Sequence, residues 1–200
     1  AELRSGIDHA AIDLSKLIAG SGGTRGVIVG ATLNREPIPR GILMAVLAFE
    51  NVHAALESVP AILQSGPASV ELLDSTVLAA ARRHETYSKL VDLLPSIDSN
   101  DPGAVLYVDW FADSEQAAAS MCEAMQIGLR DVPTLVCQDL PTRQDLWRLR
   151  KVGLGLILSG HAGGQPVGGL EDCAVPIEHL SRFQAEFESM LASHGLDATY

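Results

Sequence analysis

The segment DLWRLRK, residues 145–151, contains the densest group of cationic side chains in the chain. Trp147 and Arg150 are three residues apart, so on a helix both side chains would lie on the same side. A guanidinium is a planar fork of donors that matches a carboxylate, and an indole gives a rigid wall beside it. The spacing therefore permits a carboxylate-binding site, although the residues alone favour a simpler interpretation. That simpler interpretation is a solvated basic face with one buried tryptophan.

Two glycine-containing segments could approach a phosphate with their backbone amides. SGGTRGVIVGATL, residues 21–33, places a glycine turn before a β-branched run, and SGHAGGQPVGGLEDCAVP, residues 159–176, holds five glycines around His161. Neither segment has the spacing of a Walker loop, a nucleophile elbow or a complete dinucleotide-binding motif. An ordinary turn and a connecting loop are the simpler interpretations. The six histidines include no HExxH motif and no close pair at ligand spacing, so we expect no metal site.

Composition excludes several classes of protein. The formal net charge is -11, and the 14 Lys and Arg residues are scattered, which argues against a nucleic-acid surface. The longest apolar run, residues 42–49, is far shorter than the roughly 20 residues that cross a bilayer, so no membrane span is expected. Three distant cysteines without a CxxC pair indicate a reducing compartment. A length of 200 residues fits one medium domain, or one domain with a piece of another.

The elements that must position these side chains follow from periodicity and breakers. Apolar runs predict strands at 27–29, 41–49, 68–74, 104–111 and 134–137, with another strand beginning at 196–200. Helical spacing predicts helices at 52–63, 76–94, 115–125, 141–153 and 177–190. Two prolines in EPIPR place a domain border near Pro39. The alternation of strands and helices suits either a parallel α/β sheet or an antiparallel ferredoxin-like sandwich.

Four segments, taken in order, resemble the C-terminal half of FAD-linked oxidases of the D-lactate dehydrogenase and glycolate oxidase type, in the vanillyl-alcohol oxidase flavoprotein group. LIAGSGGTRGVIVGATLNREPIP resembles the end of the family's flavin domain, with Gly22 in place of a usual Glu and Arg25 in place of Leu. VPAILQSGPASVELLD resembles a helix, a Gly-Pro turn and a strand of the family. DLWRLRKVGLGL resembles its W-x-x-R segment, and QPVGGLEDCAVPIEHL its run from Lys-Pro to Glu-Asp-x-Ala-Val-Pro.

This resemblance implies an α+β fold, with a ferredoxin-like antiparallel sheet and helices packed on one face. Residues 1–39 would be the trailing segment of an FAD-binding domain, and residues 40–200 a substrate or cap domain that is truncated at its C-terminal end. FAD would be bound mainly by an upstream domain. The family's glycine stretch, carried over by position, makes Gly23, Thr24, Gly26 and Val27 the expected flavin contacts in this chain.

The resemblance also implies an activity. In such enzymes the flavin accepts a hydride from the C2 atom of a 2-hydroxy acid, such as D-lactate or glycolate, and the cap binds the substrate carboxylate. By position, Arg150 would bind that carboxylate, aided by Trp147 and by Gln165, which stands where many relatives have Lys. No catalytic residue is assigned. The family's G-H-x-G-D-G-N signature would come shortly after Tyr200, so this chain is expected to hold no metal ligands. Because most of the FAD cradle would lie in the upstream domain, the chain is also expected to be inactive alone.

The remaining expectations concern partners and location. The particular hydroxy acid and the electron acceptor are not specified by these residues, and an iron–sulfur cluster would belong to a fused module outside this chain. We expect a cytoplasmic protein, with peripheral attachment of the full-length protein to a membrane as the alternative. The competing function is a non-catalytic ferredoxin-like domain that binds a ligand or regulates another domain, because the same strand and helix pattern permits it.

Overall fold

The structure, a computed structural model, describes residues 15–159 and 173–200. The chain divides into two compact units, Ala1–Ile38 and Pro39–Tyr200. In the first unit the described residues form the short helix α1 (Ser15–Ile18), a turn and an extended segment. The side chains of Val27 and Val29 are 87 % and 97 % exposed there. The strand predicted at 27–29 is wrong for this unit, because among its described residues no second strand pairs with the β-branched run.

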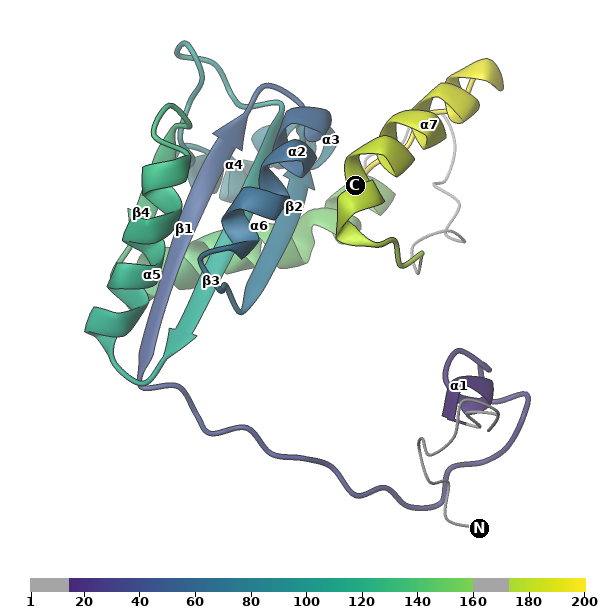
Figure 1. Cartoon of the computed structure of the whole chain (residues 1–200). Coiled ribbons are helices and arrows are strands. Elements are labelled where there is room, and N and C mark those ends of the chain that lie inside the picture. Colours follow the sequence, from purple (N-terminus) through teal and green to yellow (C-terminus); the bar gives the residue numbers. More distant parts are fainter. Residues whose placement is uncertain (1–14, 160–172) are drawn as a thin grey trace. The chain divides into compact units, whose positions relative to one another are not determined.

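The second unit contains a four-stranded antiparallel sheet (Figure 1). Its strands are β1 (Gly41–Phe49), β2 (Ser69–Asp74), β3 (Ala104–Ala112) and β4 (Thr134–Cys137), in the order β2-β3-β1-β4. Helix α2 (Val52–Leu63) connects β1 to β2, and helix α5 (Glu115–Gly128) connects β3 to β4. Two interleaved β-α-β units in this order make a ferredoxin-like sheet. The predicted α+β class and the antiparallel sheet are confirmed.

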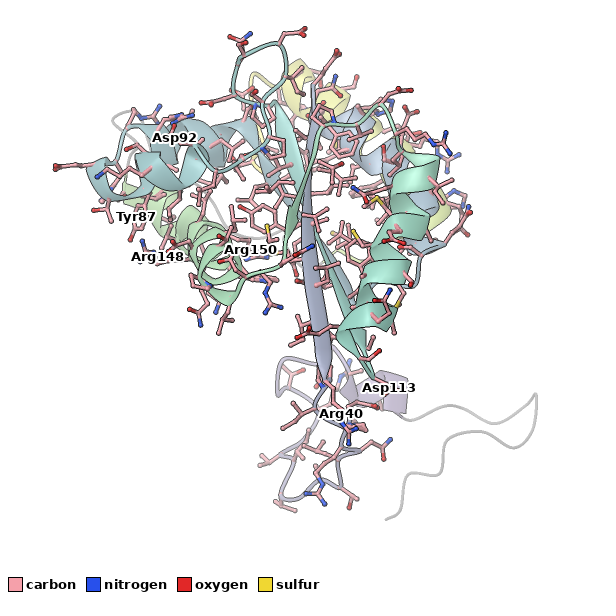
Figure 2. The ribbon with its side chains drawn as sticks, turned by 90° about the vertical axis from the view of Figure 1, so that its left-hand side faces the viewer. Arg40, Tyr87, Asp92, Asp113, Arg148 and Arg150 are labelled. Atoms are coloured by element: carbon pink, nitrogen blue, oxygen red, sulfur yellow. The ribbon has the colours of Figure 1, made fainter. Side chains whose placement is uncertain are left out.

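Helices lie on both faces of this sheet (Figure 2). Crossover helices α2 and α5 pack against one face, where Leu43, Ala45 and Leu47 of β1 point. On the other face, Met44 and Val46 meet a second layer made of α3 (Ser75–Arg82), α4 (Glu85–Val91) and α6 (Leu140–Ser159). The expectation of helices on one face therefore describes only the two crossover helices. Burial on both faces also explains why β1 is an unbroken apolar run.

Two helix boundaries differ from the sequence prediction. The helix predicted at 76–94 is two helices, because His84 leaves the helical backbone and its ring accepts the Thr86 N–H as the N-cap of α4. Helix α6 continues six residues past Gly153, where we expected it to end. A Cβ at Gly153 would lie 3.0 Å from Cγ1 of Val77 on α3, so this glycine allows two helices to approach closely and does not end one.

The chain continues after residue 172 with a 3₁₀ turn (Ile177–His179) and helix α7 (Leu180–Ser193). Helix α7 contacts α2, where the Ser181 hydroxyl lies 3.1 Å from Nδ1 of His53. Gly195, with φ of +66°, follows the helix as predicted. Residues 196–200 do not form the predicted strand; instead, the Tyr200 N–H donates to Asp74 at 3.0 Å. None of the helices in the described ranges is long and apolar enough to span a membrane.

Candidate functional site

Helix α6 directs three polar or aromatic side chains at one face of the sheet. Arg143, Trp147 and Arg150 are spaced four and three residues apart, which places them on one side of a helix. The buried side chains of Leu146 and Leu149 hold the helix against the apolar core. At its start, Asp139 accepts the Thr142 N–H at 2.9 Å, which satisfies one of the free amides of the first turn.

Two rows of side chains lie under α6, because the strand register brings them opposite one another. The first row crosses all four strands and consists of Ser69, Asp109, Met44 and Cys137. The second row consists of Glu71, Tyr107, Val46 and Leu135. Met44, Val46, Tyr107 and Cys137 all belong to the core cluster that α6 covers. The polar members of both rows are therefore concentrated at the β2 and β3 side of this face.

Arg150 forms an ion pair with Glu71, a residue 79 positions away on edge strand β2. Its Nε and Nη2 both donate to the same oxygen of Glu71, Oε2, at 3.0 and 2.7 Å. The Arg150 side chain is 44 % exposed, so the pair contributes at most about 1 kcal/mol to stability. Its main effect is to fix the direction of a guanidinium that remains accessible from solvent.

Trp147, three residues before Arg150 on α6, packs against the sheet. Its indole packs edge-on against Tyr107 on β3, with ring centroids 6.4 Å apart and an interplanar angle of 83°. Arg148, the other arginine of the DLWRLRK segment, is paired instead with Asp145 at 3.7 Å on the same helix. In Figure 2, Arg150 lies nearer to the sheet than Arg148 does. The structure thus brings Trp147 and Arg150 together, as their spacing predicts, and separates Arg148 from them.

Asp109 is a buried carboxylate in the same place, and sequence reasoning did not select it. Its residue is 3 % exposed, and the Ser69 hydroxyl donates to its Oδ2 at 3.1 Å. Burial raises the pKa of Asp109, while hydrogen bonds from Ser69 and from the Trp147 side chain, and the charge of Arg143, act in the opposite direction. The available signal was an acid in the middle of the apolar run AVLYVDWF. An acid there is buried only if other groups hydrogen-bond it.

Arg143 is the second residue that sequence reasoning missed. Its Nη1 donates to the backbone carbonyl of Ile42 on β1 at 2.9 Å. Its Nε is buried and has no hydrogen-bond partner among the residues that the structure describes. Arg143 therefore places a positive charge near Asp109 and connects the first turn of α6 to the sheet.

The other predicted contacts lie either outside the described residues or in the first unit. Gln165, like His161, lies outside the described residues. Gly23, Thr24, Gly26 and Val27 belong to the first unit, where the Thr24 hydroxyl and N–H both donate to the Ser21 carbonyl. A Cβ at Gly23 or Gly26 would meet no atom within 4 Å. In its described part, this unit consists of the short helix α1, a turn and an exposed segment of backbone. No group of three or more His, Cys, Asp or Glu residues in the described ranges could hold a metal ion.

Residues 38–200 match the family of FAD linked oxidases, C-terminal domain, and the chain belongs to this family. The match covers the whole sheet and all the helices packed on it. The resemblance that the four sequence segments indicated is therefore confirmed.

Several characterised proteins are similar to the chain at low identity. It is 26 % identical over 198 residues to a D-2-hydroxyglutarate dehydrogenase of Pantoea ananatis, covering 94 % of this chain and 19 % of that protein. It is 27 % identical to a probable mitochondrial D-lactate dehydrogenase of Danio rerio, covering 94 % and 36 %. It is 26 % identical to the glycolate oxidase subunit GlcD of Bacillus subtilis, covering 94 % and 38 %. The chain thus spans about a fifth of the length of the first relative and less than two fifths of the others.

Proposed function

We propose that this chain is the substrate-carboxylate-binding part of an FAD-linked oxidoreductase that oxidises a 2-hydroxy acid. One observation carries the proposal: Arg150 presents an exposed guanidinium that Glu71 orients and Trp147 flanks. The substrate class is supported by the family and by the names of three relatives. These names give D-2-hydroxyglutarate, D-lactate and glycolate as the substrates of those relatives. All three of those substrates carry a carboxylate next to the carbon that is oxidised.

The geometry of the ion pair leaves a binding edge on Arg150. Glu71 occupies the side of the guanidinium formed by Nε and Nη2. In the part of the chain that the structure describes, no acceptor binds Nη1. The Nη1 and Nη2 edge can therefore take a carboxylate with two parallel hydrogen bonds. A local site of this kind is needed because a chain of net charge -11 does not attract anions through its overall field.

Each residue of the proposed site has a separate role. Arg150 binds the carboxylate, Glu71 holds the guanidinium in one orientation, and Trp147 excludes water from one side. Gln165 is proposed as a further donor to the substrate. Gly23, Thr24, Gly26 and Val27 are proposed as contacts of FAD, within a trailing segment of a flavin domain formed by residues 1–39, while residues 40–200 form the substrate domain.

The test uses the full-length protein with Arg150→Ala and Arg150→Lys, assayed with D-lactate, glycolate and D-2-hydroxyglutarate. Loss of a charge-assisted bidentate contact should lower kcat/KM by about tenfold to a hundredfold, and lysine should restore only part of it because it lacks the fork. Arg148→Ala, two residues away on the same helix, is the matched control and should change kcat/KM less than twofold. Unchanged kcat/KM in Arg150→Ala would remove this residue from the site. Binding of these acids without any oxidation would favour a non-catalytic ligand-binding domain.

A further inference from the structure

We infer that the site selects a 2-hydroxy acid with an apolar side chain, because Leu154 presents an exposed hydrocarbon surface one helical turn beyond Arg150. The inference rests on the proposed function of Arg150 as the residue that binds the substrate carboxylate. It makes Leu154 a specificity-determining residue and names the class of 2-hydroxy acid that the site would prefer.

One side of helix α6 carries the polar and the apolar groups of this site. Side chains that are three or four residues apart lie on the same side of a helix. Trp147, Arg150, Leu154 and Leu158 follow this spacing. The buried residues of the helix lie on an adjacent side and are Leu146, Leu149, Gly153 and Ile157. The side that carries Arg150 therefore continues toward the end of the helix as exposed leucines.

Leu154 is the most exposed apolar side chain of α6. It is 70 % exposed and Leu158 is 51 % exposed, whereas Val152, Leu156 and Ile157 of the same turns are buried or half-buried. A single exposed leucine on a protein surface needs no explanation. Helical side chains lean toward the N-terminus of their helix, so Leu154 covers the turn that contains Arg150. A ligand held by the guanidinium would therefore lie beside this leucine.

The groups around Arg150 favour a hydrocarbon chain over a second carboxylate. Glu71 occupies one side of the guanidinium and repels a further negative charge. Lys151 is the cation on α6 that could bind a second carboxylate instead. On a helix, Lys151 is rotated about 100° from Arg150 around the axis, whereas Leu154 is rotated only about 40°. The surface that adjoins the bound carboxylate is therefore apolar.

The test uses the full-length protein with D-lactate, D-2-hydroxy-4-methylpentanoate and D-2-hydroxyglutarate. The value of kcat/KM for 2-hydroxy-4-methylpentanoate should exceed that for lactate at least about tenfold, because it has three more carbon atoms to bury. Leu154→Ala should lower this ratio at least about fivefold. Leu154→Lys should reverse the order of 2-hydroxy-4-methylpentanoate and 2-hydroxyglutarate. Because Leu154 is exposed, neither change should disturb folding.

The matched control is Leu140→Ala, which removes another exposed leucine of α6, ten residues before Arg150. It should leave the ratio of kcat/KM values unchanged. Three results would overturn the inference. The first is an unchanged ratio in Leu154→Ala. The second is a preference for 2-hydroxyglutarate that Lys151→Ala removes. The third is an equal loss for all three acids in Leu154→Lys, which would mean that Leu154 packs against another domain.

Failure of the proposed function would give a different result, because the parent protein would then oxidise none of the three acids. Calorimetric titration with 4-methylpentanoate, which has no hydroxyl to oxidise, still tests Leu154 in that case. The parent protein should bind this acid at least about fivefold more tightly than Leu154→Ala does. Equal affinity, or no binding by the parent protein, would overturn the inference.

Discussion

Arg82 on α3 donates from Nε and Nη2 to the two carboxylate oxygens of Asp101, at 2.7 and 2.6 Å. Its Nη1 also donates to Asp92, just after α4, and to the Ser88 carbonyl within that helix. One guanidinium therefore joins α3, α4 and the turn that leads into β3. The pairing lowers the pKa of Asp101 below its ordinary value of 3.8, because the hydrogen bonds from Arg82 favour the charged form.

Asp101→Asn should destabilise the protein by about 1 kcal/mol at pH 7, a modest value because both side chains are partly exposed. A lowered pKa means that this stability is present above the unfolded-state pKa and is lost as pH falls through the folded-state value. Urea unfolding at pH 7 and at about pH 2 measures it. The difference should become smaller as the pH is lowered through the folded-state pKa of Asp101. Asp145→Asn, whose partner Arg148 is more distant, should cost less at pH 7.

Asp109→Asn should have the opposite dependence on pH. Burial raises the pKa of Asp109, so the folded state holds its proton at a pH where the unfolded state has released it. The stability of the parent protein then falls as pH rises from the ordinary value of 3.8 through the raised value. Asparagine does not ionise, so its stability relative to the parent should increase across that range. Parallel stability curves for parent and variant would contradict this prediction.

Gly153 and Gly155 on α6 should respond differently to alanine. A Cβ at Gly155 meets no atom within 4 Å, so Gly155→Ala should stabilise the protein by up to about 1 kcal/mol through helix propensity. A Cβ at Gly153 meets the buried, β-branched Val77 at 3.0 Å, and that side chain has little freedom to move. Gly153→Ala should therefore lower the melting temperature while Gly155→Ala raises it. Equal shifts in both variants would mean that α3 and α6 separate freely.

The three thiols should differ in reactivity. Burial raises the pKa of Cys122 and of Cys137 to about 11, whereas Cys173 is exposed. Because the thiolate is the reactive form, iodoacetamide at pH 8 should modify Cys173 first in the folded protein. Peptide mass spectrometry after a short reaction measures this order, and Cys173→Ser should abolish the fast modification. Comparable early labelling of Cys137 would show that its face of the sheet opens readily.

The strands of the second unit could be predicted closely because their signals are local. The run 41–49 is apolar throughout and follows Pro39, and β1 has these same limits. The second helical layer could not be predicted in this way. A strand buried on both faces is apolar at every position, so its sequence does not indicate which layer each side chain faces. The sequences of α3, α4 and α6 do not indicate which face of the sheet these helices cover. The continuation of α6 past Gly153 depends on Val77, which is distant in sequence.

In the candidate site, too, some residues could be predicted from the sequence and others could not. Trp147 and Arg150 could be chosen because helical spacing alone places them side by side. The Glu71 partner required the strand order and register, since 79 residues separate it from Arg150. Asp109 required the register with Ser69 and the position of α6 above the sheet. Proximity on one element follows from periodicity, whereas proximity between elements follows from packing.

Glu71 has a second effect, because it lies on an edge strand of the sheet. Strands β2 and β4 are the outer strands, and outer strands offer backbone hydrogen-bonding groups to strands of other molecules. Strand β4 has only four residues, which limits such pairing. Strand β2 has six residues, with the charged Glu71 near its centre. Adding a foreign strand there would desolvate this carboxylate, so the side chain that orients Arg150 also opposes aggregation of the protein through β2.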